Sequence, residues 1–548
     1  MTTTAAERLV ESLVAHGVDR VFCVPGESYL NVLDALRDSN IDTIVARHEG
    51  GASMMAEADG KLTGRPGVCF VTRGPGATNA SSGLHVAEQD STPLVLFVGQ
   101  VASDLLGRGA FQEVDYDKFY GGIAKTVIQL SNGDDVAEIV RAAFGIACNG
   151  RPGPVVVALP EDLQGTLRGR LPPVGRSTPV LAVPSDADVA SLRIMLEEAE
   201  RPIAIVGGSG WSPGGVGHLQ AFAETWNFPV SVVFRRQQLF DHDHPNYAGD
   251  CGIGINPDLK NRIENADLVL LLGTRFSEIP SQGYTLLEHP ADGQRLVHVH
   301  CAECDRFAHA DLVFRCHPEQ VLVAIGNEAA KPNAQRAAQV TAAHADFEAW
   351  SAQPPRIPGS LQMGEVIQHL RAVLPDDAVI CNGAGNYTTW VHRYFRFRRF
   401  GSQLAPTSGS MGYGLPAAIA AKLRHPSRAV ICFAGDGCFQ MTSQEFGTAA
   451  QHGANVIVLV VDNGMYGTIR MHQERRFPTR THATDLVNPD FAAIARAYGG
   501  FGGTVSATEE FAPALQQALT AEVPAILHLL LDPEAITPET RLSALAGR

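Results

Sequence analysis

Gly435-Asp436-Gly437 and Asn463 are the residues of this chain whose types and spacing point most directly to chemistry. The tripeptide follows an apolar run from Ala429 to Phe433, and Asn463 follows a second apolar run from Val456 to Val461. Such runs are typical of buried strands, and a helix-like stretch near 443–450 separates them. The pattern predicts a strand-helix-strand unit with polar groups at the carboxyl ends of both strands, where open parallel sheets bind ligands.

Asp436 and Asn463 carry hard oxygen atoms of the kind that bind Mg²⁺ or Ca²⁺. Proteins usually hold Mg²⁺ with few side chains, and phosphate oxygens of a substrate or cofactor complete the coordination. The glycines on both sides of Asp436 let backbone N–H groups approach a diphosphate. Because Gly-Asp-Gly also occurs in ordinary turns, the tripeptide alone leaves a plain turn open.

Composition excludes several classes of protein. A chain of 548 residues predicts several domains, and its net charge of −15 disfavours a nucleic-acid partner and an anionic membrane surface. No apolar segment reaches about 18 residues, so we expect no transmembrane helix. Residues 1–7 lack the basic start and apolar core of a secretory signal. The ten scattered cysteines fit reduced thiols, and we expect a cytoplasmic protein.

Alternating strand and helix patterns indicate an α/β fold of three doubly wound parallel-sheet domains. Val136, Ile139, Val140 and Ala143 share one helical face. The strand candidates include Arg20–Val24, Val68–Val71, Leu94–Val98, Pro154–Pro160, Pro202–Gly208, Leu268–Gly273 and Ala525–Leu531. We place the domains at 1–170, 186–330 and 359–532, with linkers over 171–184 and 328–358. The tail, 533–548, either covers a surface or stays mobile.

Cys301-Ala-Glu-Cys304 lies near several histidines, and this content is compatible with a tetrahedral zinc site. However, His298 and His300 alternate with valines as in a strand that runs into a turn. A second Cys-x-x-Cys is missing from the sequence. The end of a strand, or the lining of a nucleotide cleft, is therefore the competing interpretation.

The metal motif resembles the thiamine diphosphate signature, and other segments extend the resemblance. Glu49, in Ala46–Ala52, is similar to the carboxylate that protonates the cofactor's aminopyrimidine ring. Taken alone, Glu49 could simply be a carboxylate at a helix start, where the helix dipole favours it. Met411 matches the apolar wedge that folds the cofactor. Gly409 matches the residue whose carbonyl lies near the cofactor's amino group, and Asn386 matches a residue that contacts the diphosphate.

The family that the chain resembles most is acetohydroxyacid (acetolactate) synthase, catalytic subunit. Motifs along nearly the whole chain support the resemblance: Phe70–Asn79, Ala110–Glu113, Gly150–Pro154 and Asn488–Phe491. The resemblance implies catalytic roles for Glu49, Phe111 and Gln112. It implies cofactor-binding roles for Glu49, Gly385, Asn386, Tyr387, Gly409, Met411, Gly435, Gly437, Cys438 and Ile469, and metal-binding roles for Asp436, Asn463 and Met465.

The resemblance also implies an assembly and a reaction. In the family, the pyrimidine domain of one subunit faces the diphosphate domain of another, so a homodimer or homotetramer with sites at the dimer interface is expected. With thiamine diphosphate and Mg²⁺, a 2-oxo acid such as pyruvate would lose CO2. The resulting enamine would add to a second carbonyl, an oxo acid or an aldehyde, and give a 2-hydroxy-ketone or a hydroxylated oxo acid.

Some residues depart from the biosynthetic members of this family. His472 stands where they have a bulky Trp that selects the acceptor, and Glu27, next to Ser28, replaces a small residue near the substrate. These three residues are candidates for substrate contacts, and they indicate a different acceptor or donor. Equally, Glu27 and His472 could be a solvated, salt-bridging pair.

FAD is a possible further cofactor. Gly207–Gly210 and Gly273–Phe276 resemble parts of the family's flavin cleft, but His300-Cys301 stands where an acidic residue could engage a ribose.

Three alternative functions remain. One is a simple 2-oxo acid decarboxylase of the benzoylformate type, which His472 keeps open. Another is a C–C lyase or acyl transferase. The third is a non-catalytic cofactor-binding subunit, which the presence of Glu49, Asp436 and Asn463 argues against.

Overall fold

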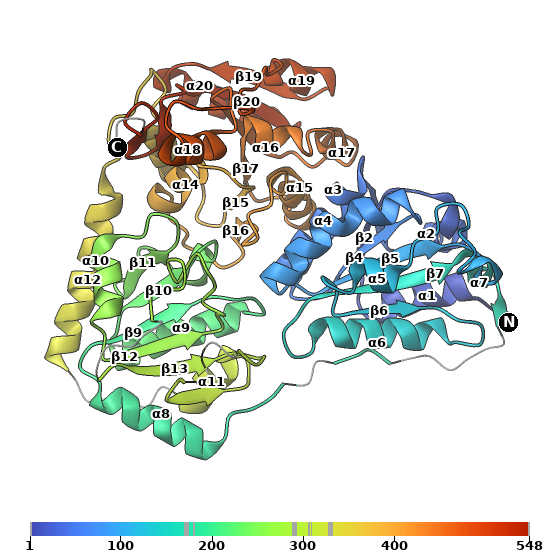
Figure 1. The fold of residues 1–548 in the computed structure, drawn as a ribbon, viewed down its shortest axis with the longest axis horizontal. Helices are drawn as coiled ribbons and strands as arrows, with labels where there is room; N and C mark the ends of the chain where they lie inside the picture. Colours follow the sequence, from blue (N-terminus) through green and yellow to red (C-terminus); the bar gives the residue numbers. More distant parts are fainter. Residues whose placement is uncertain are drawn as a thin grey trace.

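The computed structural model describes residues 3–168, 175–178, 181–287, 293–304, 307, 309–326 and 333–545. These residues form three six-stranded sheets, one in each domain, with helices on their faces (Figure 1). All strand pairs within the three sheets are parallel. The predicted α/β class with doubly wound parallel sheets is therefore confirmed.

The N-terminal sheet has the strand order β3-β2-β4-β5-β7-β6. Its strands are β2 (Arg20–Cys23), β3 (Asp42–Val45), β4 (Gly67–Val71), β5 (Leu94–Gln100), β6 (Thr126–Gln129) and β7 (Pro154–Pro160). Its helices are α1 (Ala5–Ala15), α2 (Leu30–Arg37), α3 (Glu49–Thr63), α4 (Pro75–Asp90), α5 (Tyr116–Tyr120), α6 (Val136–Cys148) and α7 (Glu161–Gln164). A short pair, β1 (Thr3–Thr4) and β8 (Leu167–Arg168), ties the two ends of the domain together.

The sequence predicted these strands well because they are apolar without interruption. Every residue of β5 and of β7 is buried, as expected where helices cover both faces of a parallel sheet. Helix α3 has local start and stop signals: the His48 side chain accepts the Gly50 N–H, and Gly64 ends the helix at φ +65°.

The middle sheet has the order β11-β10-β9-β12-β13-β14. Its strands are β9 (Pro202–Val206), β10 (Val230–Val233), β11 (Tyr247–Cys251), β12 (Leu268–Leu272), β13 (Arg295–Val299) and β14 (Leu312–Phe314). Its helices are α8 (Asp186–Glu198), α9 (Pro213–Trp226), α10 (Pro257–Glu264), α11 (Pro318–Ile325) and α12 (Ala334–Ala352). The described parts of the predicted first linker, 175–178 and 181–184, contain no helix or strand.

The prediction of a second linker over 328–358 was wrong, because its central part is helix α12. The Asn333 side chain caps this helix, and Val340, Ala343 and Phe347 are buried on one face. The Arg336 side chain is also buried and donates hydrogen bonds to the backbone carbonyls of Leu196, Ala199 and Trp226. The alanine-rich composition masked this periodic face. The helix is therefore part of the middle domain's packing.

The C-terminal sheet has the order β16-β15-β17-β18-β20-β19. Its strands are β15 (Val379–Asn382), β16 (Gln403–Leu404), β17 (Val430–Gly435), β18 (Ile457–Asp462), β19 (Phe501–Val505) and β20 (Ala525–Leu530). Its helices are α13 (Met363–Val373), α14 (Thr388–Tyr394), α15 (Gly414–Arg424), α16 (Asp436–Gln440), α17 (Glu445–Gln451), α18 (Gly467–Arg476), α19 (Phe491–Ala497) and α20 (Thr508–Thr520).

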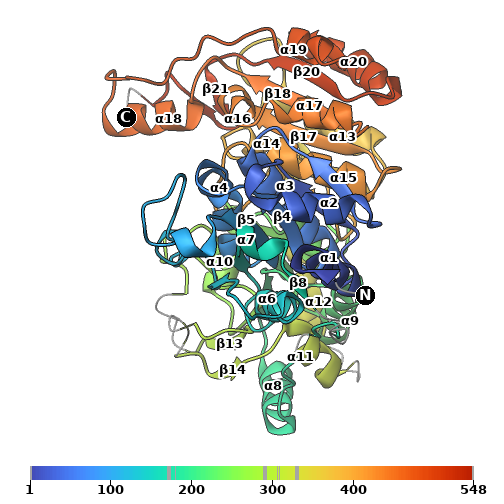
Figure 2. The same cartoon turned by 90° about the vertical axis from the view of Figure 1, so that its right-hand side faces the viewer.

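The described part of the tail folds onto this domain. It forms a hairpin of β21 (Ala535–Thr537) and β22 (Thr540–Arg541). Ile536 and Leu545 are buried and pack with Met471 of α18. Figure 2 shows the hairpin beside α18 at one end of the C-terminal domain. The tail thus covers a surface, one of the two outcomes that the sequence left open.

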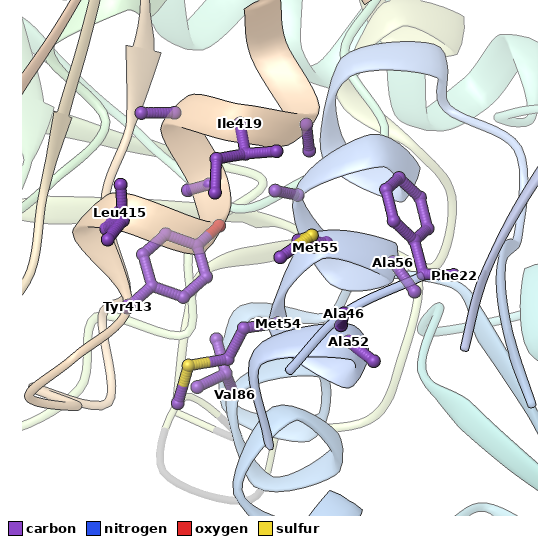
Figure 3. Close-up of a cluster of buried hydrophobic side chains, with 14 of the residues drawn as sticks. Phe22, Ala46, Ala52, Met54, Met55, Ala56, Val86, Tyr413, Leu415 and Ile419 are labelled. Carbon is purple, nitrogen blue, oxygen red and sulfur yellow. The ribbon is translucent and has the colours of Figure 1, made fainter. Parts of the chain in front are cut away.

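The N-terminal and C-terminal domains share one hydrophobic core. Tyr413, directly before helix α15, and Ile419 of that helix lie toward Met54 and Met55 of α3, and Leu415 lies on the other side of the Tyr413 ring (Figure 3). Since all five side chains are buried, the contact fixes how the two domains sit together. None of the described helices is long and apolar enough to cross a membrane.

The pH dependence of stability should depend in part on His392 of α14. Its ring is buried edge-on against Phe234 of the middle domain, and its Nε2 has no hydrogen-bond partner among the described residues. Burial, reinforced by the charge of Arg235, lowers the pKa of His392 from 6.5 to about 3. Below pH 6.5 the unfolded chain therefore binds a proton that the folded chain rejects. Stability is lost as pH falls toward 3.

We predict that His392→Phe reduces this acid-side loss. At each pH, the free energy of unfolding of the variant is compared with that of wild type. We expect this difference to be about 2 kcal/mol more stabilising at pH 5 than at pH 8. Urea unfolding at both pH values measures this difference. An equal difference at the two pH values would show that His392 does not titrate as described.

Candidate active site

A cavity of about 250 Å³ lies at the carboxyl edge of the C-terminal sheet. It contains every C-terminal residue that the sequence analysis assigned to the cofactor or the metal: Gly385, Asn386, Tyr387, Gly409, Met411, Gly435, Asp436, Gly437, Cys438, Asn463, Met465 and Ile469. These residues come from the ends of β15, β17 and β18, from the 409–411 loop and from α18. The topology therefore brings four separate chain segments, 385–387, 409–411, 435–438 and 463–469, to one site.

The backbone around the metal motif is closely approached by side chains. A Cβ atom at Gly437 would lie 2.6 Å from the ring of Tyr466, so only glycine fits there. Gly412 has φ +80° and a Cβ there would lie 2.9 Å from Met441, which fixes glycine in the loop that carries Met411. At Gly437, which lines the cavity, no side chain of its own covers the backbone, as a diphosphate site requires.

Asp436 is only 3% exposed at the end of β17. Burial raises its pKa to about 6, and the neighbouring Asp462 works in the same direction. The Asn488 side-chain amide opposes this effect because it donates to Asp436 Oδ2 at 2.7 Å. A buried carboxylate beside a second carboxylate is stabilised by a cation. The donor set of Asp436 and Asn463 therefore fits a hard divalent ion.

The loop that carries Gly409 and Met411 is fixed at its start by Asp90. The Thr407 N–H and hydroxyl both donate to Asp90 Oδ1, the former at 3.0 Å. Asp90 has no exposed side-chain surface and also contacts Lys61 Nζ at 2.6 Å and Arg236 Nη2 at 3.1 Å. Burial acts to raise the pKa of Asp90, but Lys61 and Arg236 outweigh it and hold the pKa below its usual range.

The same loop is fixed at its end by Glu57. The Tyr413 hydroxyl donates to Glu57 Oε2 at 2.6 Å, and Thr92 donates to Glu57 Oε1 at 2.6 Å. Lys61 Nζ lies 3.0 Å from the same Oε1. A buried ionic cluster of the N-terminal domain, Glu57, Lys61 and Asp90, therefore holds both ends of the loop.

Glu49, the predicted catalytic carboxylate, is the first residue of α3 and is half-buried. Its Oε2 accepts a hydrogen bond from Asn79 Nδ2 at 3.0 Å. The backbone of Gly76 lies against it, because a Cβ there would be 3.3 Å from Glu49 Oε1. The preceding residue, His48, caps α3 by accepting the Gly50 N–H.

Phe111 and Gln112 lie on the loop after β5. Gln112 has φ +63°, a backbone conformation that costs energy for a residue other than glycine, and its Cβ packs against Gly74. Glu113 supports the loop by accepting the N–H groups of Gly107 and Ala110. The Phe111 side chain is 77% exposed. The loop therefore presents the Phe111 ring to solvent from a braced backbone.

The three candidate substrate residues are in different environments. Glu27 is exposed, at the start of a short 3-10 helix, and His472 is exposed on α18. Ser28 is buried, its Oγ lies 2.8 Å from Thr72 Oγ1, and it accepts the Arg73 N–H. No hydrogen bond or ion pair joins Glu27 to His472 among the described residues, and the substrate roles stay predictions.

Within the described chain, the residues that line the C-terminal cavity all lie between 384 and 536. Glu49, Phe111 and Gln112 are therefore not part of that cavity in a single copy of the chain. The residues of the predicted site therefore lie on two separate surfaces of one chain, each at the carboxyl edge of its own sheet.

A cleft at the carboxyl edge of the middle sheet is rich in cationic side chains. It is lined by Gly208 and Gly273, which follow β9 and β12, and by Asp90 and Thr407. A Cβ at Gly208 would overlap the Gly273 carbonyl oxygen, so the two turns are in backbone contact. The cationic residues that line the cleft are Arg151, Arg236 and Arg275. His300 and His317 also line it, and burial lowers the pKa of both rings. Cys301 lines it too, which matches the expected cleft lining.

Several residues of the site were missed in the sequence. Asn488 was noted only as part of a motif, and Glu57, Asp90 and Arg236 gave no signal because isolated charges usually lie on the surface. Ile536 of the tail also lines the C-terminal cavity. An acidic residue inside an otherwise apolar helical segment, as with Glu57 in α3, is the one pattern that could have drawn attention.

Comparisons with known proteins agree with this geometry. Family models of thiamine pyrophosphate enzymes match three segments: the N-terminal TPP binding domain over residues 3–119, the central domain over 189–325 and the C-terminal TPP binding domain over 383–529. The fold and the site thus define a thiamine pyrophosphate enzyme.

Relatives place the chain more closely. It is 30% identical to acetolactate synthase isozyme 2 large subunit of Escherichia coli K12 over 532 residues, which cover 96% of this chain and 95% of the relative. It is 32% identical to the acetolactate synthase large subunit of Parasynechococcus marenigrum, with 96% and 87% coverage. A probable acetolactate synthase large subunit of Methanocaldococcus jannaschii is 29% identical, with 97% and 93% coverage. The chain belongs to the acetolactate synthase family and is a thiamine diphosphate-dependent carboligase of that type.

The hydroxyl of Tyr413 should contribute measurably to stability. Tyr413→Phe removes a donor from the buried Glu57 carboxylate, and we expect the free energy of unfolding to fall by about 1–3 kcal/mol. Tyr498→Phe, at an exposed tyrosine, is the matched control and should change it by about 0.5 kcal/mol or less. Equal effects of the two substitutions in urea unfolding would contradict the importance of the cluster.

Proposed function

We propose that this enzyme decarboxylates a 2-oxo acid, such as pyruvate, and transfers the resulting acyl unit to the carbonyl of a second oxo acid or an aldehyde. The product is a 2-hydroxy-ketone or a hydroxylated oxo acid. The observation that carries the proposal is the C-terminal cavity, in which Asp436, Asn463 and the glycine backbone of the motif face one space. Thiamine diphosphate, when bound, supplies a nucleophilic carbon and accepts the electrons released with CO2.

Mg²⁺ is the proposed metal, held by the side-chain oxygens of Asp436 and Asn463 and by the backbone carbonyl of Met465. The support is the buried carboxyl of Asp436 beside the oxygen-bearing Asn463, a donor set suited to a hard cation that also binds phosphate oxygens. Asn386 and the Gly435–Gly437 backbone would bind the diphosphate. Met411 would pack against the cofactor, because its side chain lies half-buried in the cavity wall.

Glu49 is the proposed catalytic carboxylate that holds a proton at the aminopyrimidine ring nitrogen. Its half-buried position and its bond from Asn79 support this role, since they fix the carboxyl while leaving it accessible. Gln112, with its fixed backbone, and Phe111 would close the substrate side of the site.

The complete site is proposed to form between two copies of the chain, in a homodimer or homotetramer. Glu49 of one copy would meet the Asp436 cavity of the other. This arrangement is supported by the separation of the two halves within one chain and by the 77% exposure of Phe111, which a second copy would cover.

A phosphate-bearing nucleotide, with FAD as the candidate, is proposed for the middle cleft. Arg151, Arg236 and Arg275 supply the positive charge that phosphates require, and Gly208 and Gly273 supply turns without side chains at the switch point of the sheet. The absorption spectrum of the purified protein tests whether the group is a flavin.

The free thiols of all ten cysteines are the support for a proposed cytoplasmic location.

Glu27, Ser28 and His472 are proposed to influence the choice of acceptor or donor. The exposed imidazole of His472 on α18, close to Ile469 in the cavity wall, presents a polar group where the family has a bulky aromatic one. A smaller, polar side chain leaves room for a larger or more polar acceptor.

Incubation of the protein with thiamine diphosphate, Mg²⁺ and a panel of 2-oxo acids tests the proposed reaction. We expect CO2 release together with a carboligation product. CO2 with only an aldehyde as product would identify a simple decarboxylase. No turnover of any 2-oxo acid would favour a lyase, an acyl transferase or a non-catalytic role.

We predict that Glu49→Gln lowers kcat about 100-fold or more, because the amide cannot hold the proton at the aminopyrimidine ring. Thiamine diphosphate should still bind, and the melting temperature should stay within a few degrees of wild type. Glu138→Gln, at an exposed glutamate of α6, is the control and should leave kcat unchanged. Retained activity in Glu49→Gln would remove Glu49 from the catalytic site.

A further inference from the structure

Asn488 joins two carboxylates at the metal-binding edge of the C-terminal sheet. Its side-chain nitrogen, Nδ2, lies 2.7 Å from Asp436 Oδ2 and 2.7 Å from Asp462 Oδ1. Its side-chain oxygen, Oδ1, accepts a hydrogen bond from Gln440 Nε2 at 2.9 Å. Each of the two N–H hydrogens of one amide group is therefore directed at a different carboxylate.

The two carboxylates need such a bridge because they are close together and largely buried. Asp436 follows β17 and Asp462 ends β18, and these strands are direct neighbours in the sheet. Like charges at this separation repel, and little solvent is present to screen them. A neutral amide that donates to both offsets the repulsion without adding a charge of its own.

Asp462 is itself fixed from the other side. His528 Nε2 on β20 lies 2.8 Å from Asp462 Oδ2, and the Gly464 N–H donates to Asp462 Oδ1 at 2.9 Å. Asp462 therefore serves as an anchor for Asn488. The hydrogen bond from Asn488 engages Oδ2 of Asp436. This bond fixes the orientation of the Asp436 carboxylate relative to the cavity.

A purely local role for Asn488 is not supported. It lies just before helix α19, but the residue that caps this helix is Asp490, whose Oδ1 accepts the Ala493 N–H at 3.0 Å. The Asn488 side chain takes no part in that cap. Its polar atoms reach Asp436, Asp462 and Gln440, which are residues of the metal edge.

We propose that Asn488 is a positioning residue that holds the Asp436 carboxylate in the orientation required for a divalent cation. This inference rests on the proposed function, in which Asp436 binds Mg²⁺. Interactions of this kind orient metal ligands, and their loss typically weakens metal binding about 10–100-fold.

The test uses the full-length protein freed of cofactor, with Mg²⁺ added in the presence of thiamine diphosphate and binding followed by calorimetry. For Asn488→Ala we expect the apparent Kd for Mg²⁺ to rise about 10–100-fold. At saturating Mg²⁺, kcat should stay within a few-fold of wild type, while the melting temperature without metal should fall by a few degrees because the two carboxylates lose their shared donor. This split between metal affinity and turnover would not result from a general loss of structure.

Two further variants sharpen the result. Gln440→Ala removes the bond to Asn488 Oδ1 and a long, 3.4 Å bond to the Asp436 carbonyl, but it leaves both contacts of Asn488 with the carboxylates, so its Mg²⁺ affinity should change about three-fold at most. Asn488→Ser keeps a small polar group and replaces Asn488→Ala as the test variant if the alanine protein does not fold. It should also bind Mg²⁺ more weakly.

The outcomes separate this inference from the proposed function. If wild type requires Mg²⁺ for thiamine diphosphate binding but folded Asn488 variants bind Mg²⁺ as tightly as wild type, the positioning role is overturned and the metal site stands. If wild type shows no Mg²⁺ dependence, the metal assignment of Asp436 fails, and the role of Asn488 fails with it.

Discussion

The buried ionic cluster of Glu57, Lys61 and Asp90 is the interaction on which the arrangement of this chain depends. Charges without solvent require partners, and breaking such a set leaves an uncompensated buried charge. The cluster finds partners in all three domains, because Arg236 reaches it from the middle domain and Tyr413 from the C-terminal domain. The loop that carries Met411 is thereby held from outside its own domain. The position of the cofactor loop and the relative position of the domains are therefore set together.

Parallel sheets explain why the chemistry is divided. Each sheet presents its functional groups at its carboxyl edge: Glu49 after β3, the middle cleft after β9 and β12, and Asp436 after β17. The shared core of α3 and α15 fixes the N-terminal and C-terminal domains with their halves of the site apart. A second copy of the chain is the simplest way to join Glu49 to an Asp436 cavity. The exposed Phe111 then becomes part of an interface.

The sequence predicted what local pattern and motif determine. The strand Pro154–Pro160 was predicted with correct bounds because every residue is buried. Motifs singled out C-terminal residues that the fold brings into one cavity, although their roles stay predictions. Helix α12 was mistaken for a linker because its small residues hide the buried face. Asn488 and Arg236 act on partners 52 and 146 residues away, and no periodicity records such contacts. Their roles required the three-dimensional arrangement.

The shared active site is the central claim, and complementation between two inactive variants tests it most directly. Glu49→Gln and Asp436→Asn proteins are each expected to be inactive, and they are mixed after dissociation and reassembly. If the site forms between two chains, each mixed dimer contains one intact site. About a quarter of all sites should then recover activity with a 2-oxo acid. If the mixture stays inactive while native gels or mass spectrometry show mixed dimers, Glu49 and Asp436 do not meet across an interface.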